Sequence, residues 1–513
     1  MRRRFFLVAG LAQVFVTCGV HPVKQSGSLD VEELTVSEIH GAYQAGTFTC
    51  EQLVNAYVKR INELDGDINS ITTLNPQAVS IARQLDEEYR RTRVLRPLHG
   101  IPIIVKDNIE TRGLPTTAGS LALQNFLPPQ DAFIVDKLVS AGAIVLAKSN
   151  MAEWAFSPWS TISSTAGVTV NPYNPVYAPA GSSGGTAAAV AANFGTLGLG
   201  TDTGNSIRGP SAYCALVGFR TTLGLVSRGG VVPLYLRNDV VGPMCRTVED
   251  ATRVLEITAG YDPGDPITVN SKGKIPGSYR VFLQKDGLKG ARIGVLRMLS
   301  EVDTDPEVAA VFENALGELK TLGAELIDNI AVPHFDSLRQ DQWCNDFKKD
   351  IEHYLATNVR IDSMRTLADV IRVGSRQQRV AERVLSTQNN PAQPNSSQEC
   401  LDAYTDPRRI AFRKAIEDQM DLLRLDAIVY PTWNNKPTRI GSTGEDYKGD
   451  NSRVIAPHTG QPAFTVPMGF TSENIPLGLQ FLGRMYSEPT LIKLTYAYEY
   501  GTRHRRPPGI GKN

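Results

Sequence analysis

The sequence has no excess of charge of either sign. Its 53 Lys and Arg residues balance 53 Asp and Glu residues among 513 positions, so the formal net charge is zero. A protein that binds nucleic acid usually presents a basic surface, and a disordered acidic chain needs an excess of carboxylates. The balance argues against both classes, and we expect no nucleic-acid partner. Hydrophobic residues make up 42% of the chain, which is enough for a large core.

The sequence also lacks the closely spaced ligands of a metal site. None of its six cysteines forms a Cys-x-x-Cys pair, and the seven histidines are dispersed, with no His-Glu-x-x-His. Protein ligands of zinc commonly come in such closely spaced pairs. We therefore expect neither a metal nor an organic cofactor.

Residues 1–26 have the pattern of a secretory signal. Three arginines at positions 2–4 precede the apolar stretch 5–20, which is short for a membrane span. We expect cleavage near residues 19–26 and an exported protein, periplasmic or extracellular, with no stable membrane span in its mature form. The order Arg-Arg-Arg-Phe-Phe also resembles a twin-arginine signal. Two alternatives are a lipoprotein anchored at Cys18, although the residue before it fits poorly, and a buried or frayed helix.

The hydrophobic pattern of the following residues alternates between helices and strands. Apolar residues recur at three- and four-residue steps in helices, and buried strands are short continuous apolar runs. The pattern predicts helices at 35–64 (interrupted near Gly46), 132–141 and 186–193, strands at 100–105, 143–147 and 426–430, and a strand hairpin at 469–481. Polar, turn-rich stretches mark the edges of a variable helical region at about 260–420. The alternation indicates the α/β class.

A glycine- and serine-rich turn, Gly181-Ser182-Ser183-Gly184-Gly185, precedes the alanine-rich helix. A phosphate-binding P-loop would need a Lys after it, and none is present. The centre of the turn fits the G-x-S-x-G nucleophile elbow of α/β-hydrolases, with Ser183 as nucleophile and a late histidine as base. The residues before the turn form a poor strand, which that motif requires. An esterase that uses Ser183 stays an alternative.

Three separated stretches together resemble the amidase signature family. Lys106 ends an apolar run that begins at His99, Ser182 lies in the glycine-rich turn, and Ser206 lies in the stretch Gly-Thr-Asp-Thr-Gly-Asn-Ser-Ile-Arg-Gly at 200–209. The spacing of 24 residues between the two serines also matches. The family usually has Gly-Gly-Ser at the nucleophile, whereas Asn205 replaces the second glycine here. Because Asn tolerates unusual backbone angles, we expect the turn to survive this change.

The resemblance implies one large α/β domain over residues 27–505, with a mixed sheet covered by helices on both faces, and a tail at 506–513. It also implies a serine amide hydrolase that acts on a small-molecule or peptide amide. Ser206 would attack the carbonyl carbon, Ser182 would relay its proton, and Lys106 would be the base if burial depresses its pKa.

Further residues of the same stretches would support the reaction. The oxyanion would be held by the backbone N–H groups of four consecutive residues, Thr203, Gly204, Asn205 and Ser206. Supporting side chains would be Ser183, Asp202 and Arg208, of which the last two would clamp the turn. An apolar cluster before the serine-rich turn would line the acyl pocket, or simply pack in the core: Met151 and Trp154, with Phe156 and Trp159.

Two other functions fit the same resemblance. The glutaminase component of a tRNA amidotransferase looks similar, but such an enzyme works in the cytoplasm, which the predicted export signal opposes. A binding protein without catalysis would not need Lys106, Ser182 and Ser206, and all three are present. For the assembly, we consider a homodimer.

Overall fold

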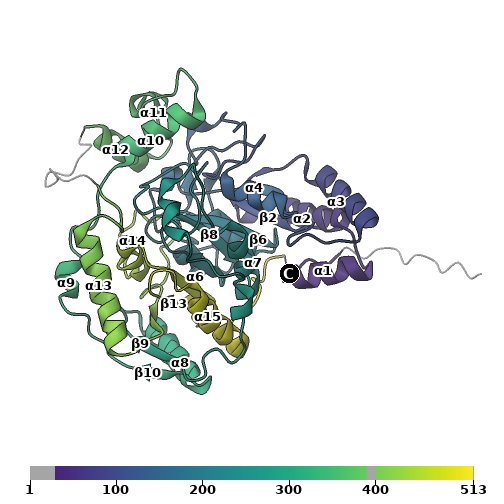
Figure 1. Cartoon of the computed structure of the whole chain (residues 1–513). Helices are drawn as coiled ribbons and strands as arrows, with labels where there is room; N and C mark the ends of the chain where they lie inside the picture. Colours follow the sequence, from purple (N-terminus) through teal and green to yellow (C-terminus); the bar gives the residue numbers. More distant parts are fainter. Residues whose placement is uncertain (1–28, 390–399, 512–513) are drawn as a thin grey trace, which may run out of the picture.

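One mixed β-sheet organises the residues that the computed structural model describes, 29–389 and 400–511. Its 11 strands lie in the order β1-β3-β2-β6-β8-β7-β12-β13-β11-β9-β10. Figure 1 labels β2, β6, β8, β13, β9 and β10. In chain order they are β1 (Ile71–Leu74), β2 (Pro102–Lys106), β3 (Ile144–Ser149), β6 (Leu197–Asp202), β7 (Val217–Arg220), β8 (Val240–Cys245), β9 (Arg292–Val295), β10 (Glu325–Ile327), β11 (Ala427–Pro431), β12 (Ala463–Phe470) and β13 (Pro476–Leu482). The expected single α/β domain with a mixed sheet is confirmed. The predicted signal at 1–26 lies outside the described residues.

The direction of the strands changes across the sheet. β2 is parallel to both β3 and β6, and β9 is parallel to β10 and β11. The central strands β6, β8, β7, β12 and β13 pair antiparallel in succession. A small separate hairpin is formed by β4 (Ile162–Ser163) and β5 (Gly167–Val168). Because β2 and β6 are parallel neighbours, their carboxyl ends lie at the same edge of the sheet, where sites of α/β proteins commonly form.

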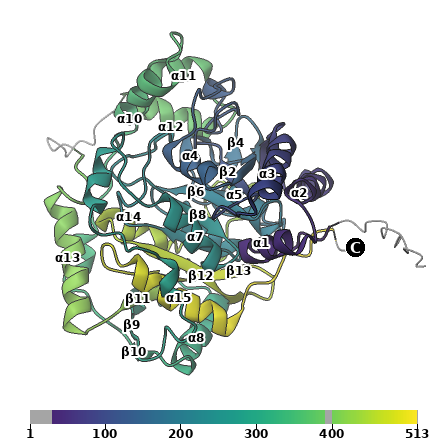
Figure 2. The same ribbon diagram turned by 45° about the vertical axis from the view of Figure 1, so that its right-hand side comes forward.

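Helices pack around this sheet from both sides (Figures 1 and 2). The α-helices are α1 (Val36–Ala45), α2 (Cys50–Leu64), α3 (Ala78–Thr92), α4 (Phe133–Ser140), α5 (Gly184–Ala191), α6 (Arg208–Tyr213), α7 (Val248–Thr258), α8 (Pro306–Thr321), α9 (Phe335–Leu338), α10 (Phe347–Tyr354), α11 (Leu367–Val373), α12 (Gln378–Asn389), α13 (Pro407–Leu422), α14 (Ala456–Thr459) and α15 (Glu488–Thr502). α5 contacts β2 and β6, while α6 contacts β7, β12 and β13. None of the described helices is long and apolar enough to cross a membrane.

The ends of the first two helices follow directly from local sequence. Thr35 and Thr49 each cap a helix with the side chain, and Glu38 and Gln52 complete two capping boxes. Gly46 ends α1 in the left-handed conformation, with φ 70°, which glycine adopts at no steric cost. The break that the sequence predicts near Gly46 is therefore confirmed.

The region at 260–420 differs from the helical region that the sequence predicts. It contains α8 to α13, but it also contributes β9 and β10, which extend the main sheet. β9 pairs with β11, whose residues lie more than 130 positions later. Ile293 and Val295 are completely buried there, so a short apolar run that looks unremarkable in the sequence forms part of the sheet. The predicted hairpin is present as β12 and β13, although its first strand begins at Ala463.

Candidate active site

The site forms where β2, β6 and the N-terminal end of α5 meet. Lys106 is the last residue of β2, and the turn 203–206 directly follows β6. Ser182 and Ser183 immediately precede α5, which packs against both strands. The parallel pairing of β2 with β6 therefore brings Lys106 to the same edge as the turn that carries Ser206.

Close packing explains the glycines of the serine-rich turn. A Cβ atom on Gly181 would collide with the carbonyl oxygens of Ser157 and Ser160, and one on Gly185 would collide with the backbone of Asn150. The peptide bond between Gly181 and Ser182 is cis. Larger side chains at these two glycines would push the turn away from the strand ends, so the composition of the motif follows from this contact.

Lys106 is completely buried and contacts the first of the two predicted serines. Its Nζ donates to Oγ of Ser182 at 2.7 Å and to Oγ1 of Thr201, also at 2.7 Å. Burial lowers its pKa to about 7, although the negative charges of Asp202 and Asp239 oppose that shift. A lysine with this pKa is partly neutral at neutral pH and has a lone pair that can accept a proton. Thr201 lies in the predicted motif, but its residue type gave no signal of this role.

Ser206 lies at the floor of a cavity and keeps 5% of its surface exposed. Its hydroxyl donates to Oδ1 of Asn205 at 3.4 Å, and among the described residues no hydrogen bond joins it to Ser182. None of the hydrogen bonds within 29–389 and 400–511 has a backbone N–H of residues 203–206 as donor. Four consecutive N–H groups next to a serine hydroxyl can bind an oxyanion.

The side chain of Asn205 is anchored by a second contact. Its Nδ2 donates to the carbonyl of Pro158 at 3.0 Å, and Asn205 is 2% exposed. Asn205 is not among the described non-glycine residues with positive φ, so the tolerance of Asn for unusual backbone angles is not used here. The replacement of glycine thus adds a side chain beside Ser206 rather than a special backbone conformation.

A buried ionic cluster of Asp202, Arg208 and Arg220 supports the turn 203–206. It contains the pair Asp202 and Arg208, which we expected to clamp this turn. Arg208 Nε lies 3.1 Å from Oδ2 of Asp202, and Arg220 Nη1 lies 2.8 Å from Oδ1. Arg208 also donates through Nη2 to the carbonyl of Gly204 at 2.7 Å. Although burial acts to raise it, the two guanidinium groups lower the pKa of Asp202 to about 2. Arg220 is a member of this cluster that no local pattern indicated.

Ser183 has a structural hydrogen bond in place of a basic partner. Its hydroxyl donates to the carbonyl of Thr201 at 3.2 Å, and Ser183 is completely buried. The two histidines considered as its base lie elsewhere: His458 packs edge-on against Trp343, and His504 contacts Glu318. The described residues therefore place no histidine against Ser183, and the esterase alternative loses its base.

A cavity of about 390 Å³ opens above Ser206. Its walls are largely aromatic and polar, and the residues that line it are Ala155, Phe156, Pro158, Trp159, Thr203, Gly204, Asn205, Ser206, Leu234, Tyr235, Trp343, Cys344, Asn345, Arg383, Ser386, Thr387 and Arg453. Phe156 and Trp159 from the predicted apolar cluster are among them. Met151 and Trp154 are not: both belong to a core cluster around Phe347, and the Trp154 ring lies 6.0 Å from that ring. For these two residues the packing alternative describes the structure, because their side chains face the core.

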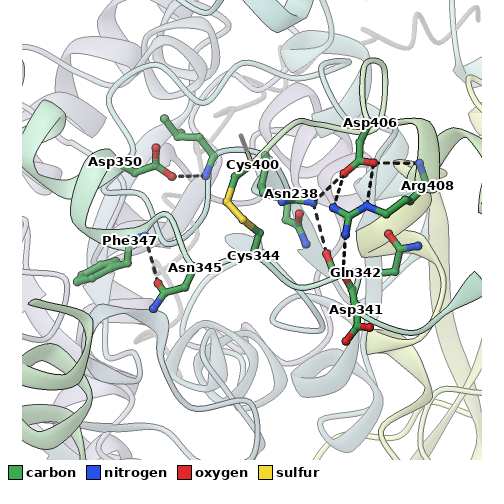
Figure 3. The surroundings of a disulfide bond; sticks show 12 residues. Asn238, Asp341, Gln342, Cys344, Asn345, Phe347, Asp350, Cys400, Asp406 and Arg408 are labelled. Carbon is green, nitrogen blue, oxygen red and sulfur yellow. Dashed lines mark hydrogen bonds and ion pairs between the residues drawn. A yellow bond between two sulfur atoms is a disulfide. The ribbon is translucent and has the colours of Figure 1, made fainter. Parts of the chain in front are cut away.

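A disulfide between Cys344 and Cys400 fixes one wall of this cavity (Figure 3). Cys344 itself lines the cavity, and Trp343 and Asn345 are its neighbours on either side. The bond joins positions 56 residues apart. The three remaining described cysteines are buried and free. Within the part of the chain that the structure describes, no group of three or more His, Cys, Asp or Glu side chains is placed to hold a metal ion.

Comparisons with known proteins agree with this geometry. The model of the Amidase family matches residues 52–492. A probable amidase of Arabidopsis thaliana is 33% identical over 98% of this chain and 96% of its own length. A glutamyl-tRNA(Gln) amidotransferase subunit of Alkaliphilus metalliredigens is 34% identical over 92% of this chain and 97% of its own length. Among solved structures, the native peptide amidase of Stenotrophomonas maltophilia superposes with a TM-score of 0.80 at 35% identity, covering 94% of this chain and 99% of that one.

The match covers the whole region that forms the sheet and the site, from α2 to α15. The sequence relatives match over nearly their full lengths, and the solved peptide amidase shares the fold over nearly its full length. The chain belongs to the amidase signature family of amide-hydrolysing enzymes.

Proposed function

We propose that the enzyme cleaves a carboxylic amide through an acyl-enzyme on Ser206, with Ser182 and Lys106 as proton relay and base. The observation that carries the proposal is the hydrogen bond between a completely buried Lys106 and Ser182 beside the turn of Ser206. A serine hydroxyl is a weak nucleophile until a base takes its proton. In the free enzyme the Ser206 hydroxyl contacts Asn205, so it turns toward Ser182 before the attack.

The reaction then runs in two steps. Ser206 Oγ bonds to the carbonyl carbon while its proton passes through Ser182 to Lys106, and the N–H groups of residues 203–206 receive the oxyanion. When the C–N bond breaks, the proton returns through Ser182 to the leaving nitrogen, and ammonia or an amine departs. Water attacks the acyl-enzyme by the same route, and the products are a carboxylate and regenerated Ser206.

The test replaces the nucleophile. We expect Ser206→Ala to abolish hydrolysis of a primary amide, measured as ammonia release, while circular dichroism shows an intact fold. A fluorophosphonate probe labels Ser206 in the wild type, and the modified residue is located by peptide mass spectrometry. Ser183→Ala is the matched control, because it removes a neighbouring serine hydroxyl and should leave the labelled position unchanged. Labelling at Ser183 in the wild type would refute the assignment.

The similarity to a peptide amidase and to amidotransferase subunits supports two classes of substrate. We favour a free-standing amidase that acts on small or peptide amides. The alternative, the glutaminase component of an amidotransferase, rests on the relatives that carry that name. Ammonia release from a panel of primary, aryl and peptide amides by the isolated chain separates the two. Activity on glutamine alone, and only with added partner subunits, would favour the alternative. Light scattering would measure whether the isolated chain is a homodimer.

We also propose that the protein is exported. The basic and apolar pattern of residues 1–26 supports export, and so does the disulfide between Cys344 and Cys400. Structural disulfides persist in oxidising compartments and are rare in the cytoplasm. N-terminal sequencing of the protein from its natural host should give a start near residues 19–26. An intact Met1 on a soluble cytoplasmic protein with reduced Cys344 would refute export.

A further inference from the structure

The cavity above Ser206 has a one-sided charge. Two arginines, Arg383 and Arg453, line it, and within the described residues its lining contains no Asp or Glu. Four aromatic side chains complete its walls: Phe156, Trp159, Tyr235 and Trp343. Each guanidinium group attracts anions and is costly to desolvate, so two of them in the lining of one cavity favour an anionic ligand.

Arg453 is the closer of the two to the reacting centre. Its Nε lies 3.6 Å from the point where a Cβ atom of Gly204 would stand, and its Cγ lies 3.5 Å from that point. Gly204 belongs to the turn 203–206, which lines the cavity. The guanidinium group of Arg453 therefore lies directly against the oxyanion turn.

The donors of Arg453 are only partly used by the protein. Nη1 donates to the hydroxyl of Tyr447 at 3.0 Å, and the guanidinium group lies 4.9 Å from the ring centre of Trp343. The hydrogen bonds of the described residues assign no acceptor to Nε or Nη2, and no ion pair of Arg453 is present among them. Nε and Nη2 share one edge of the guanidinium plane, which is the edge that binds a carboxylate through two parallel hydrogen bonds.

The charged groups around Arg453 leave that edge free. The negative charge of Asp450 acts on Arg453, but the two groups form no ion pair among the described residues. The oxygens of Asp450 instead accept hydrogen bonds from the hydroxyls of Tyr447 at 2.9 Å and Ser452 at 2.8 Å. The guanidinium group of Arg383 donates to the carbonyl of Phe156 and the hydroxyl of Tyr235. It lies against the Phe156 ring and adds a second positive charge at the exposed rim.

We infer that the substrate carries a carboxylate close to the scissile amide and that Arg453 binds this carboxylate through Nε and Nη2. The inference rests on the proposed function, because it assigns a substrate class to the site of Ser206. The stacking of Arg453 on Trp343, beside Cys344 of the disulfide, holds the guanidinium group in one orientation before the ligand binds. Substrates of this class are amide-bearing acids, in which the amide and the carboxylate are separated by a short apolar chain that fits between the aromatic walls.

The test measures binding without turnover. In a Ser206→Ala background, isothermal titration compares succinamate, which has a primary amide and a carboxylate, with butanamide, which has the same amide and a methyl group in place of the carboxylate. A pair of charge-assisted hydrogen bonds should make succinamate bind about tenfold tighter or more. Adding Arg453→Met should remove the difference, and Arg453→Lys should retain part of it, because Lys keeps the charge but not the fork. Lys448→Met is the matched control, since Lys448 lines a neighbouring surface cavity and not this one.

The outcomes are separate from those of the proposed function. Equal binding of the two ligands, binding of neither, or a preference that survives Arg453→Met would overturn the inference. The analogue 3-phosphonopropanamide tests whether the site prefers a phosphonate group to a carboxylate. If it binds more tightly than succinamate, the ligand class is a phosphonate or phosphate, and the inference as stated is refuted. Hydrolysis of butanamide by the wild type, lost in Ser206→Ala, tests the amidase reaction alone. A preference in binding without any hydrolysis would leave the site standing and refute the reaction.

Discussion

The protonation of Lys106 should control the activity of the enzyme. Lys106 is completely buried, and burial lowers its pKa from 10.5 to about 7. The base must be neutral to accept the proton of Ser182, so acid should remove activity as Lys106 takes up a proton. We expect kcat/KM on a primary amide to follow an acidic limb with its midpoint near pH 7 and to reach a plateau above it.

The magnitude follows from the shift. With a pKa of about 7, roughly a hundredth of Lys106 is neutral at pH 5, so kcat/KM there should be about a hundredth of its plateau value. A shift of this size corresponds to about 5 kcal/mol of differential stabilisation between the two protonation states. Because the folded pKa lies below the unfolded one, the unfolded chain binds more protons between these values. The wild type should therefore lose stability, relative to Lys106→Met, as the pH falls from about 10 to about 7.

The assay measures ammonia release between about pH 5 and pH 9, with circular dichroism at each pH to confirm that the chain is folded. Lys106→Arg keeps the positive charge but does not deprotonate, so it should be inactive throughout. Asp239→Asn removes one of the two charges that raise the pKa of Lys106, and it should move the acidic limb to lower pH. A midpoint that stays fixed in Asp239→Asn, or an active Lys106→Arg enzyme, would refute Lys106 as the titrating base.

Three further variants test the surroundings of the site. Asn205→Gly removes the side chain beside Ser206. We expect kcat/KM for branched amides to rise about tenfold relative to kcat/KM for butanamide. An unchanged ratio of the two values would show that the Asn205 side chain does not restrict the substrate. Replacing both Cys344 and Cys400 with Ser should lower the free energy of unfolding by roughly 2–4 kcal/mol in urea titrations, and added reductant should then have no further effect. Arg208→Met leaves the buried carboxylate of Asp202 with one partner fewer, so the free energy of unfolding in urea should fall by about 3–5 kcal/mol. A fall within the error of the titration would mean that Arg220 alone is enough to stabilise Asp202.

Short motifs, together with the family resemblance that they carry, indicated the candidate site residues Lys106, Ser182 and Ser206. Three features of short sequence segments carried this prediction. They are the spacing of Ser182 and Ser206, the glycines of the serine-rich turn, and the apolar run before Lys106. The capping boxes of α1 and α2 and the fully buried, alanine-rich α5 were predictable for the same reason. Capping depends on neighbours a few residues away, so local residue types specify it.

Other features depended on strand order and long-range packing, which local patterns do not specify. The sequence of β9 and β10 lies within a region predicted to be helical, and only the pairing of β9 with the distant β11 makes them part of the sheet. Met151 and Trp154 are close to the serine-rich turn in sequence, yet their side chains face the core cluster around Phe347.

The cavity above Ser206 was decided by the tertiary structure. Its walls come from segments near residues 155, 204, 235, 343, 383 and 453, and no local pattern links them. Arg453 lies in a polar stretch with no recognisable motif, and only the packing of that stretch against Gly204 and Trp343 brings its guanidinium group beside the turn that carries Ser206. The residues proposed for the reaction therefore come from short motifs, although the pairing of β2 with β6 is needed to bring Lys106 to the edge that carries Ser206. The choice of substrate lies in contacts between segments that are distant in the sequence, because a cavity exists only once the sheet and its helices have packed.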